Sequence, residues 1–250
     1  MEIKRNILLK LEYNGLAFSG WQIQNELRTV QSEIITSLEK FLDHEISLTG
    51  AGRTDTGVHA RGQYANFYTS RNIPTEIIMH KLNRMLPKDI AVLACCEVDN
   101  GFNSRKNAIS RTYNYIIFEN PSALSQGSAW VIGRPLNLKT LQSLSTIVSR
   151  SNHFYNFCKI KSRKLNNDCK ISSASWKRAD SRLIFKISAD RFLHNMVRLL
   201  VGSMVAVLDN RLPLIKFEKM FNEDQDDKAR FIAPPYGLYL INVKYKGIKL

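Results

Sequence analysis

The segment 52–60, GRTDTGVHA, holds the residues of this chain whose types and spacing best suit chemistry. Asp55 stands two residues after Arg53 and between two glycines, which let the backbone turn tightly. A carboxylate beside a guanidinium stays ionised and keeps a fixed direction, so Asp55 is the first candidate for a chemical role. The spacing alone nevertheless favours a structural role, in which Asp55 bridges Arg53 or caps a turn.

The overall charge bears on this choice. Lys and Arg total 36 of the 250 residues against 22 Asp and Glu, a formal net charge of +14. Because the excess is spread along the chain, it indicates a polyanionic partner, with nucleic acid first and an anionic membrane surface second, although a basic surface can also serve solubility alone. A lone carboxylate in a cleft for a polyanion would weaken binding, which favours a chemical reason for Asp55.

A second candidate segment is RTYNY, residues 111–115. In a strand, Arg111, Tyr113 and Tyr115 would share one face. A cation beside two aromatic rings would form a stacking platform for an unpaired base. Two tyrosines packed over a core explain the same pattern equally well.

The third candidate is Arg198, which lies within the otherwise apolar helical pattern FLHNMVRLLVG, residues 192–202. A buried guanidinium needs a partner because an unpaired buried charge is costly, and Asp55 is the natural carboxylate to propose. The alternative is that the long side chain reaches the surface.

Metal and cofactor motifs are missing from the sequence. It has no phosphate-binding glycine loop, nucleotide fingerprint or zinc pattern, and its four cysteines and five histidines lack metal-ligand spacing. We therefore expect no metal and no organic cofactor. The cysteines suggest free thiols in a reducing compartment, and we find neither a signal peptide nor a membrane span, so we expect a soluble, cytoplasmic protein.

The elements that would position these residues follow from periodicity. The first half predicts a strand at 7–13, a helix capped by Thr29, a strand near 64–69, a helix from Pro74 and a strand at 90–98. The second half predicts strands near 113–117, 174–178, 183–189 and 239–245, and helices at 138–148, about 193–208 and near Phe217.

Both halves, 1–104 with the Asp55 loop and 105–250 with Tyr113 and Arg198, thus read strand, helix, strands, helix, strand. This order predicts an α+β fold of two related split-βαβ halves, similar to ferredoxin or RNA-recognition domains. We expect their antiparallel sheets to join, with helices packed on one face and a central basic cleft. The least regular segment, 159–170, contains five cations that suit phosphate contact or simple solvation.

The chain resembles the tRNA pseudouridine synthase A family. Segment 52–60 closely matches that family's active-site motif, and further matches follow in the family's order over nearly the whole chain. They are YNG at 13–15, GWQ at 20–22, LN at 82–83, LPKDI at 86–90, and segments 102–115, 192–202 and 234–239.

The resemblance implies conversion of uridine to pseudouridine in the anticodon stem-loop of tRNA, without metal or organic cofactor, by a homodimer. It implies that Asp55 is the catalytic carboxylate, that Tyr113 stacks on the flipped uracil, and that Arg198 pairs with Asp55. Arg53 would fill the gap left by the extruded nucleotide, and Leu238 would pack against the base. Whether Asp55 attacks the ribose, adds to the base or removes a ribose proton stays open.

Two departures from the family pattern bear on the range of targets rather than on the chemistry. The chain has Asn152-His153 where the family usually has His-Asp, and Asn103 where a His is common. Two rival functions are a non-catalytic RNA-binding module and an Asp-dependent hydrolase of a small nucleotide. The first leaves Arg53, Asp55 and Arg198 without a purpose, and the second has no use for the charge.

Overall fold

The chain forms two compact units in a computed structural model that describes residues 4–159, 167–222, 228–248 and 250. The first unit is Met1–Ile109 with Leu240–Leu250, and the second is Ser110–Tyr239. Two consecutive halves, 1–104 and 105–250, were expected. The C-terminal segment belongs with the first unit because Ile109 N–H donates to the Lys244 carbonyl (2.8 Å) and the Tyr245 hydroxyl donates to the Ser104 carbonyl (2.7 Å).

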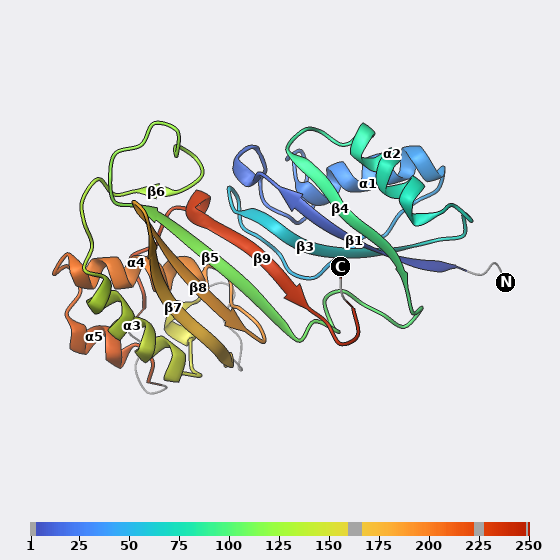
Figure 1. Cartoon of the computed structure of the whole chain (residues 1–250). Helices are drawn as coiled ribbons and strands as arrows, with labels where there is room; N and C mark the ends of the chain where they lie inside the picture. The colour runs from blue at the N-terminus through green and yellow to red at the C-terminus, as the bar shows by residue number, and fades with distance from the viewer. Residues whose placement is uncertain (1–3, 160–166, 223–227, 249) are drawn as a thin grey trace. The chain divides into compact units, whose positions relative to one another are not determined.

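The first unit is a small antiparallel sheet with two helices (Figure 1). Strand β1 lies between β4 and β3, and the short β2 pairs with the far side of β3. The elements in chain order are β1 (Arg5–Tyr13), η1 (Gly15–Ala17), α1 (Val30–Leu42), β2 (Thr49–Gly50), β3 (His59–Thr69), α2 (Thr75–Met85) and β4 (Ile90–Val98).

Strand β3 begins earlier than its alternation predicts, at His59 instead of near Tyr64. The reason is burial: nine of its eleven residues are buried, so the first part of the strand carries no polar alternation for a sequence pattern to detect. This extension matters for function, because β3 then starts only four residues after Asp55.

Helix α1 begins where the sequence indicates. The Thr29 side chain accepts from Ser32 N–H, and the Ser32 side chain accepts from Thr29 N–H, a reciprocal cap. Val30, Ile34 and Leu38 are buried along one face, and α1 contacts α2, which also packs against β4. The mutual contact places both helices on the same face of the sheet.

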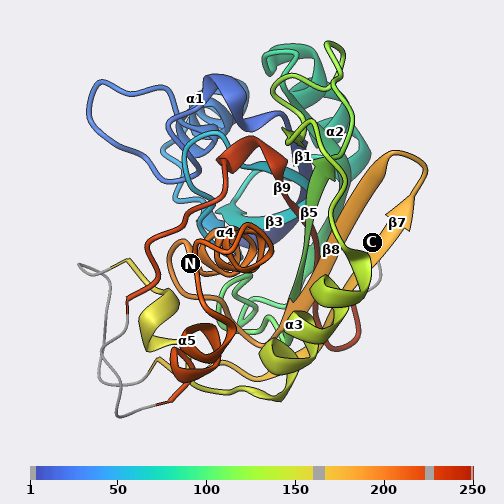
Figure 2. The ribbon, with the colours of Figure 1, turned by 90° about the vertical axis from the view of Figure 1, so that its left-hand side faces the viewer.

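The second unit repeats a sheet-and-helix arrangement, with β8 antiparallel to both β5 and β7. In Figure 2 its helices gather on one side of these strands. The elements are β5 (Ser110–Phe118), β6 (Trp130–Val131), α3 (Leu138–Arg150), η2 (Tyr155–Phe157), β7 (Ile171–Ala179), β8 (Arg182–Ala189), α4 (Met196–Leu208), α5 (Leu214–Lys219) and η4 (Pro235–Gly237). Strand β9 (Leu238–Lys244) follows and carries the chain back to the first unit.

Two details of the second unit differ from expectation. Strand β6 pairs with β5 in parallel, not antiparallel, because the chain loops back alongside β5 instead of reversing in a hairpin. Helix α4 starts at Met196, not near Leu193. Asn195 has a φ of 66°, a left-handed conformation that a right-handed helix cannot contain.

No helix in the described part of the chain is long and apolar enough to cross a membrane.

Candidate functional site

The loop that carries Asp55 joins β2 to β3 in the first unit and is held along its length by the segment 18–21. Trp21 N–H donates to the Thr54 carbonyl (3.1 Å), and Gly57 N–H donates to the Phe18 carbonyl (3.4 Å). Val58 N–H donates to the Asp55 carbonyl (3.1 Å) and closes the turn. The Asp55 side chain is partly exposed. The backbone on both sides of Asp55 is held by hydrogen bonds, at Thr54 and at Gly57.

Segment 18–21, which we call the bracing segment, can support the Asp55 loop because the two backbones lie very close together. Gly20 has a φ of +91°, and a Cβ at this position would lie 2.7 Å from the Thr54 carbonyl oxygen. Any other residue would therefore be strained in conformation and would push the loop away from segment 18–21. The position of the Asp55 backbone thus depends on a glycine that lies 35 residues earlier in the sequence.

Buried side chains complete the support of the loop. The Tyr13 hydroxyl and Thr54 Oγ1 share a 2.7 Å hydrogen bond, and Gln63 Nε2 donates to the Gly52 carbonyl (2.9 Å). Burial raises the pKa of Tyr13 well above its ordinary value, and its hydrogen bonds oppose that shift only in part, so the hydroxyl keeps its proton. His59 is buried, and its Nδ1 accepts from Gly15 N–H (3.1 Å).

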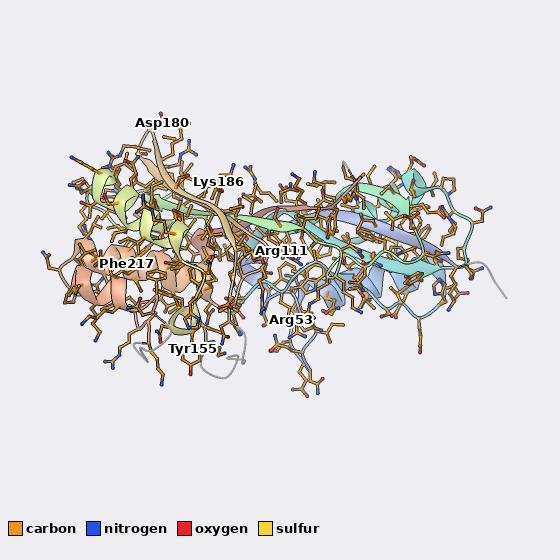
Figure 3. The ribbon with its side chains drawn as sticks, turned by 90° about the horizontal axis from the view of Figure 1, so that it is seen from below. Arg53, Arg111, Tyr155, Asp180, Lys186 and Phe217 are labelled. Carbon is orange, nitrogen blue, oxygen red and sulfur yellow. The ribbon has the colours of Figure 1, made fainter. Side chains whose placement is uncertain are left out.

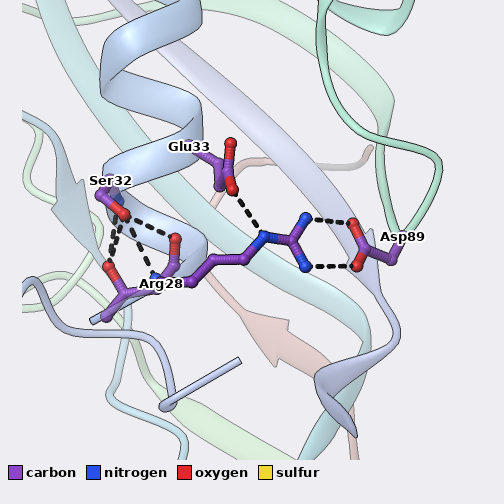
Figure 4. A network of polar contacts seen from close by, with 5 residues as sticks. Arg28, Ser32, Glu33 and Asp89 are labelled. Carbon is purple, nitrogen blue, oxygen red and sulfur yellow. Dashed lines mark hydrogen bonds and ion pairs between the residues drawn. The ribbon is translucent and has the colours of Figure 1, made fainter. Parts of the chain in front are cut away.

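Arg28 anchors the start of the bracing segment (Figure 4). Its guanidinium makes a two-pronged ion pair with Asp89 (2.8 and 3.1 Å), and its Nε donates to Glu33 (2.7 Å). The same group lies 4.2 Å from the centre of the Phe18 ring. The Arg28 carbonyl accepts from Ser19 N–H (2.8 Å), so segment 18–19 is tied both to α1 and to the turn before β4.

Arg53 is exposed, and Figure 3 labels it among the side chains of the first unit. Its Nε donates to Gln22 Oε1 (3.0 Å). Gln22 directly follows the bracing segment, and this contact orients the exposed guanidinium. An exposed and oriented cation is suited to meet a ligand that approaches from solvent.

Tyr113 lies in the middle of β5, opposite Ile187 of β8. Its side chain is buried with 9% of its surface exposed, and its ring meets Phe192 edge-on, with centroids 5.1 Å apart at 86°. An edge-on aromatic neighbour holds the plane of the tyrosine ring.

Tyr115 does not belong to the stacking platform that the sequence suggested. It shares the strand face with Tyr113 as predicted, but it is fully buried and its hydroxyl donates to the Pro234 carbonyl (2.8 Å). Arg111 donates through Nη1 to the Asp190 carbonyl (2.7 Å). Tyr115 is therefore part of the core and cannot stack on a base.

Arg198 occupies the third position of α4 and is partly buried. Its Nε donates to the Ala233 carbonyl (2.9 Å), and its Nη1 donates to Asn195 Oδ1 (3.2 Å). Both of these acceptors are neutral oxygens, so they orient the guanidinium without cancelling its charge.

Leu238 is the first residue of β9 and has 6% of its surface exposed. Its N–H donates to the carbonyl of Pro235, the first residue of η4. Residues 233–238 therefore link two predicted site residues. The Ala233 carbonyl at one end accepts from Arg198, and Leu238 is the other end.

The predicted site residues fall into two groups. Arg53 and Asp55 share one loop of the first unit, whereas Tyr113, Arg198 and Leu238 belong to the second unit. Sequence reasoning overlooked Tyr13 and Gly20 as supports of the Asp55 loop, although the segments YNG and GWQ that contain them had been singled out. In the described residues, no three His, Cys, Asp or Glu side chains gather to hold a metal.

The remaining predicted features lie at the periphery. Asn103 Oδ1 accepts from Arg105 N–H and Lys106 N–H (3.0 Å each), and the His153 ring stacks on Tyr155 with centroids 6.2 Å apart. Most of the cationic segment 159–170, residues 160–166, lies outside the described residues.

Comparison with known proteins gives consistent matches. The model of the tRNA pseudouridine synthase family matches residues 11–105 and 151–246. "tRNA pseudouridine synthase A" of Pelodictyon phaeoclathratiforme is 37% identical over 242 residues, covering 96% of this chain and 100% of the relative. The protein of the same name from Chlorobium luteolum is 38% identical over 244 residues, covering 96% of each, and that from Azobacteroides pseudotrichonymphae is 35% identical over 235 residues, covering 94% of each.

Proposed function

The chain belongs to the tRNA pseudouridine synthase family, and from that premise we propose how its residues isomerise uridine in tRNA. The enzyme is an isomerase that converts uridine to pseudouridine. We propose the anticodon stem-loop as its target, in keeping with the resemblance described above. The observation that carries the assignment of the site is the Asp55 loop, in which a partly exposed carboxylate stands on a backbone fixed from both sides.

The reaction breaks the bond between the ribose and a ring nitrogen of uracil and remakes it to a ring carbon of the same base. The ring carbon loses its proton and the freed ring nitrogen gains one, so the composition of the nucleotide is unchanged and no external reactant is consumed. The enzyme must instead extrude the base, at a cost of a few kcal/mol in lost stacking and pairing, and hold it beside one oriented group. A rigid loop with a single acid meets the second requirement.

In this proposal Asp55 is the catalytic carboxylate, and Arg198 is the cation that pairs with it. The acceptors Ala233 and Asn195 support this role, because they direct the guanidinium and, being neutral oxygens, do not neutralise its charge. Which atom Asp55 engages first, on the ribose or on the base, is a question for labelled substrates.

Tyr113, Leu238 and Arg53 would handle the extruded nucleotide. Tyr113 offers a ring whose plane Phe192 fixes, and Leu238 offers an apolar side chain at the start of β9. Arg53 is exposed, so its guanidinium can enter the stack that the base has left. The net charge of +14 supports binding of a polyanion by a basic cleft.

We further propose that each unit is a split-βαβ half and that the sheets of the two halves join. In the first unit the strand order β4-β1-β3-β2, with helices between β1 and β2 and between β3 and β4, supports this topology. A homodimer is the assembly we propose, and a measurement of molar mass in solution tests it. The four cysteines are free thiols, as is usual for proteins of a reducing compartment, and this supports a cytoplasmic location.

Mapping of pseudouridine in tRNA tests the assignment. Wild-type protein should modify uridines of the anticodon stem-loop, and Asp55→Ala should modify none while it still binds tRNA. Asp43→Asn is the matched control, because Asp43 is a highly exposed carboxylate of the same unit at a position that Asn also tolerates.

Full modification by Asp55→Ala would refute the role of Asp55. Tight tRNA binding by the wild type without any pseudouridine would favour the RNA-binding module, and release of free uracil would favour the hydrolase.

A further inference from the structure

The segment 231–237, which we call the strap, directly precedes β9 in the chain and packs on helix α4, which carries Arg198. At its N-terminal end it lies directly on α4: a Cβ on Gly202 would collide with the Phe231 carbonyl and would lie 2.9 Å from Ala233 N. Ala233 N–H donates to the Arg198 carbonyl (3.0 Å), and the Ala233 carbonyl accepts from Arg198 Nε (2.9 Å). The strap is thus bonded to Arg198 through both backbone and side chain.

Tyr115 holds the other end of the strap. Its hydroxyl donates to the Pro234 carbonyl (2.8 Å), and its ring is packed against Gly237, where a Cβ would lie 2.7 Å from Tyr115 Cζ. Trp130 meets the Tyr115 ring edge-on at 87°, with centroids 6.3 Å apart. The Tyr115 ring is therefore packed against both Trp130 of β6 and Gly237 of the strap.

The chemistry of the Tyr115 hydroxyl fits a permanent anchor. Burial raises the pKa of Tyr115 far above its ordinary value, and the charge of Arg198 opposes this shift. The phenol consequently remains a proton donor to Pro234 throughout the working pH range. The influence of Arg198 on this pKa also indicates that the two side chains lie within electrostatic reach of each other.

We propose that Tyr115 is a positioning residue for the isomerisation: by holding the strap on α4, it sets the direction of the Arg198 guanidinium and the place of Leu238. The proposal rests on the function proposed above, in which Arg198 and Leu238 serve the reaction. Tyr115 itself touches no substrate, because it is fully buried.

Arg198 and Leu238 are both attached to the same stretch of chain. Arg198 takes its direction from the Ala233 carbonyl, and Leu238 follows Gly237 directly, so both depend on a stretch of six residues, 233–238. Within this stretch, Pro234 has no N–H with which to make a backbone bond of its own. Loss of the Tyr115 hydroxyl leaves the Pro234 carbonyl without this donor and frees the middle of the stretch.

The test compares Tyr115→Phe with Tyr239→Phe. Both variants lose a tyrosine hydroxyl that donates to a backbone carbonyl of the second unit, over 2.8 Å to Pro234 and over 2.6 Å to Ser128, respectively. Tyr115→Phe should lower kcat about tenfold, the effect of roughly one lost hydrogen bond, while Kd for tRNA changes by less than about twofold. Tyr239→Phe should leave kcat within about twofold of the wild type.

A second readout does not depend on activity. Amide hydrogen exchange at Ala233 reports the bond between the strap and α4, and it should become about tenfold faster in Tyr115→Phe and stay unchanged in Tyr239→Phe. Unchanged kcat or unchanged Ala233 exchange in Tyr115→Phe would overturn the proposal, as would equal losses in both variants.

The exchange experiment also separates this proposal from the function on which it rests. A wild-type protein that makes no pseudouridine, combined with faster Ala233 exchange in Tyr115→Phe, would refute the proposed function and retain the anchoring role.

Discussion

At the scale of single residues, two tyrosines on one strand face have different surroundings. Tyr113 retains a small exposed fraction and is oriented by Phe192, whereas Tyr115 is fully enclosed between Trp130 and Gly237. The same sequence alternation predicts both side chains on one face, and only the neighbours that pack on the strand distinguish the partly accessible Tyr113 ring from the fully buried Tyr115 ring. Conservative substitutions can therefore separate their roles.

Tyr113→Phe should slow turnover more than it weakens binding. The phenyl ring keeps the stacking surface, so we expect Kd for tRNA to change by less than about twofold, since stacking on aromatic rings carries the contact. The lost hydroxyl should lower kcat by about tenfold or more if it assists proton transfer at the base. Single-turnover rates and filter binding measure the two effects.

Tyr68→Phe serves as the control, because Tyr68 is an exposed tyrosine of the first unit whose hydroxyl donates to the Asn100 carbonyl. Equal losses of rate and affinity in Tyr113→Phe would indicate that this residue only binds RNA.

At the scale of elements, the Asp55 loop owes its shape to the end of β1 and the segment that follows it. Tyr13 is the last residue of β1, and its hydroxyl is hydrogen-bonded to Thr54, the residue before Asp55. Gly20 then allows the backbone to pass beside the same loop. The position of Asp55 thus depends on contacts that span about a sixth of the chain, and a defect in β1 should reach the chemistry.

Tyr13→Phe should expose this dependence. The substitution leaves the buried Thr54 hydroxyl without its partner, which should lower the free energy of unfolding by about 1–3 kcal/mol. It should also lower kcat about tenfold, because the backbone that carries the carboxylate loses one of its supports. Urea denaturation and single-turnover kinetics measure the two quantities.

Tyr245→Phe is the matched control, since it removes a buried tyrosine hydroxyl that donates to the Ser104 carbonyl in the same unit. A similar loss of stability with an unchanged kcat is expected there. A normal kcat in Tyr13→Phe would show that the loop keeps its shape without this bond.

At the scale of the whole molecule, charge governs the encounter with RNA. An excess of 14 positive charges over 250 residues favours association with a phosphate backbone, and each phosphate contact releases condensed counterions. Affinity for tRNA should therefore depend steeply on salt, whereas the isomerisation of bound tRNA should not.

Raising KCl from 50 to 200 mM should weaken tRNA binding by at least about tenfold, with a linear relation between log Kd and log salt concentration. The single-turnover rate at saturating protein should change by less than about twofold. Anionic vesicles of phosphatidylserine test the alternative partner and should not compete with tRNA at equal charge concentration. An affinity for tRNA that is insensitive to salt would contradict an electrostatic origin of binding.

The sequence by itself determined the family, the candidate residues and most of the elements, because these depend on local order. The motif around Asp55, the cap at Thr29 and the strand at 90–98 are each contained in a few consecutive residues. Local patterns were insufficient where burial removes alternation, as at the start of β3, or where one backbone angle ends a helix, as at Asn195.

The tertiary structure alone decided which residues support the site. Tyr13 reaches Thr54 across 41 positions, and Tyr115 reaches Pro234 across 119 positions. Neither pairing leaves a trace in periodicity or spacing, because side chains that meet in the folded core are chosen by packing between elements rather than by their neighbours in the chain. Composition and motif thus single out Asp55 as the candidate acid, whereas the packing of distant segments determines how the loop that carries it is held.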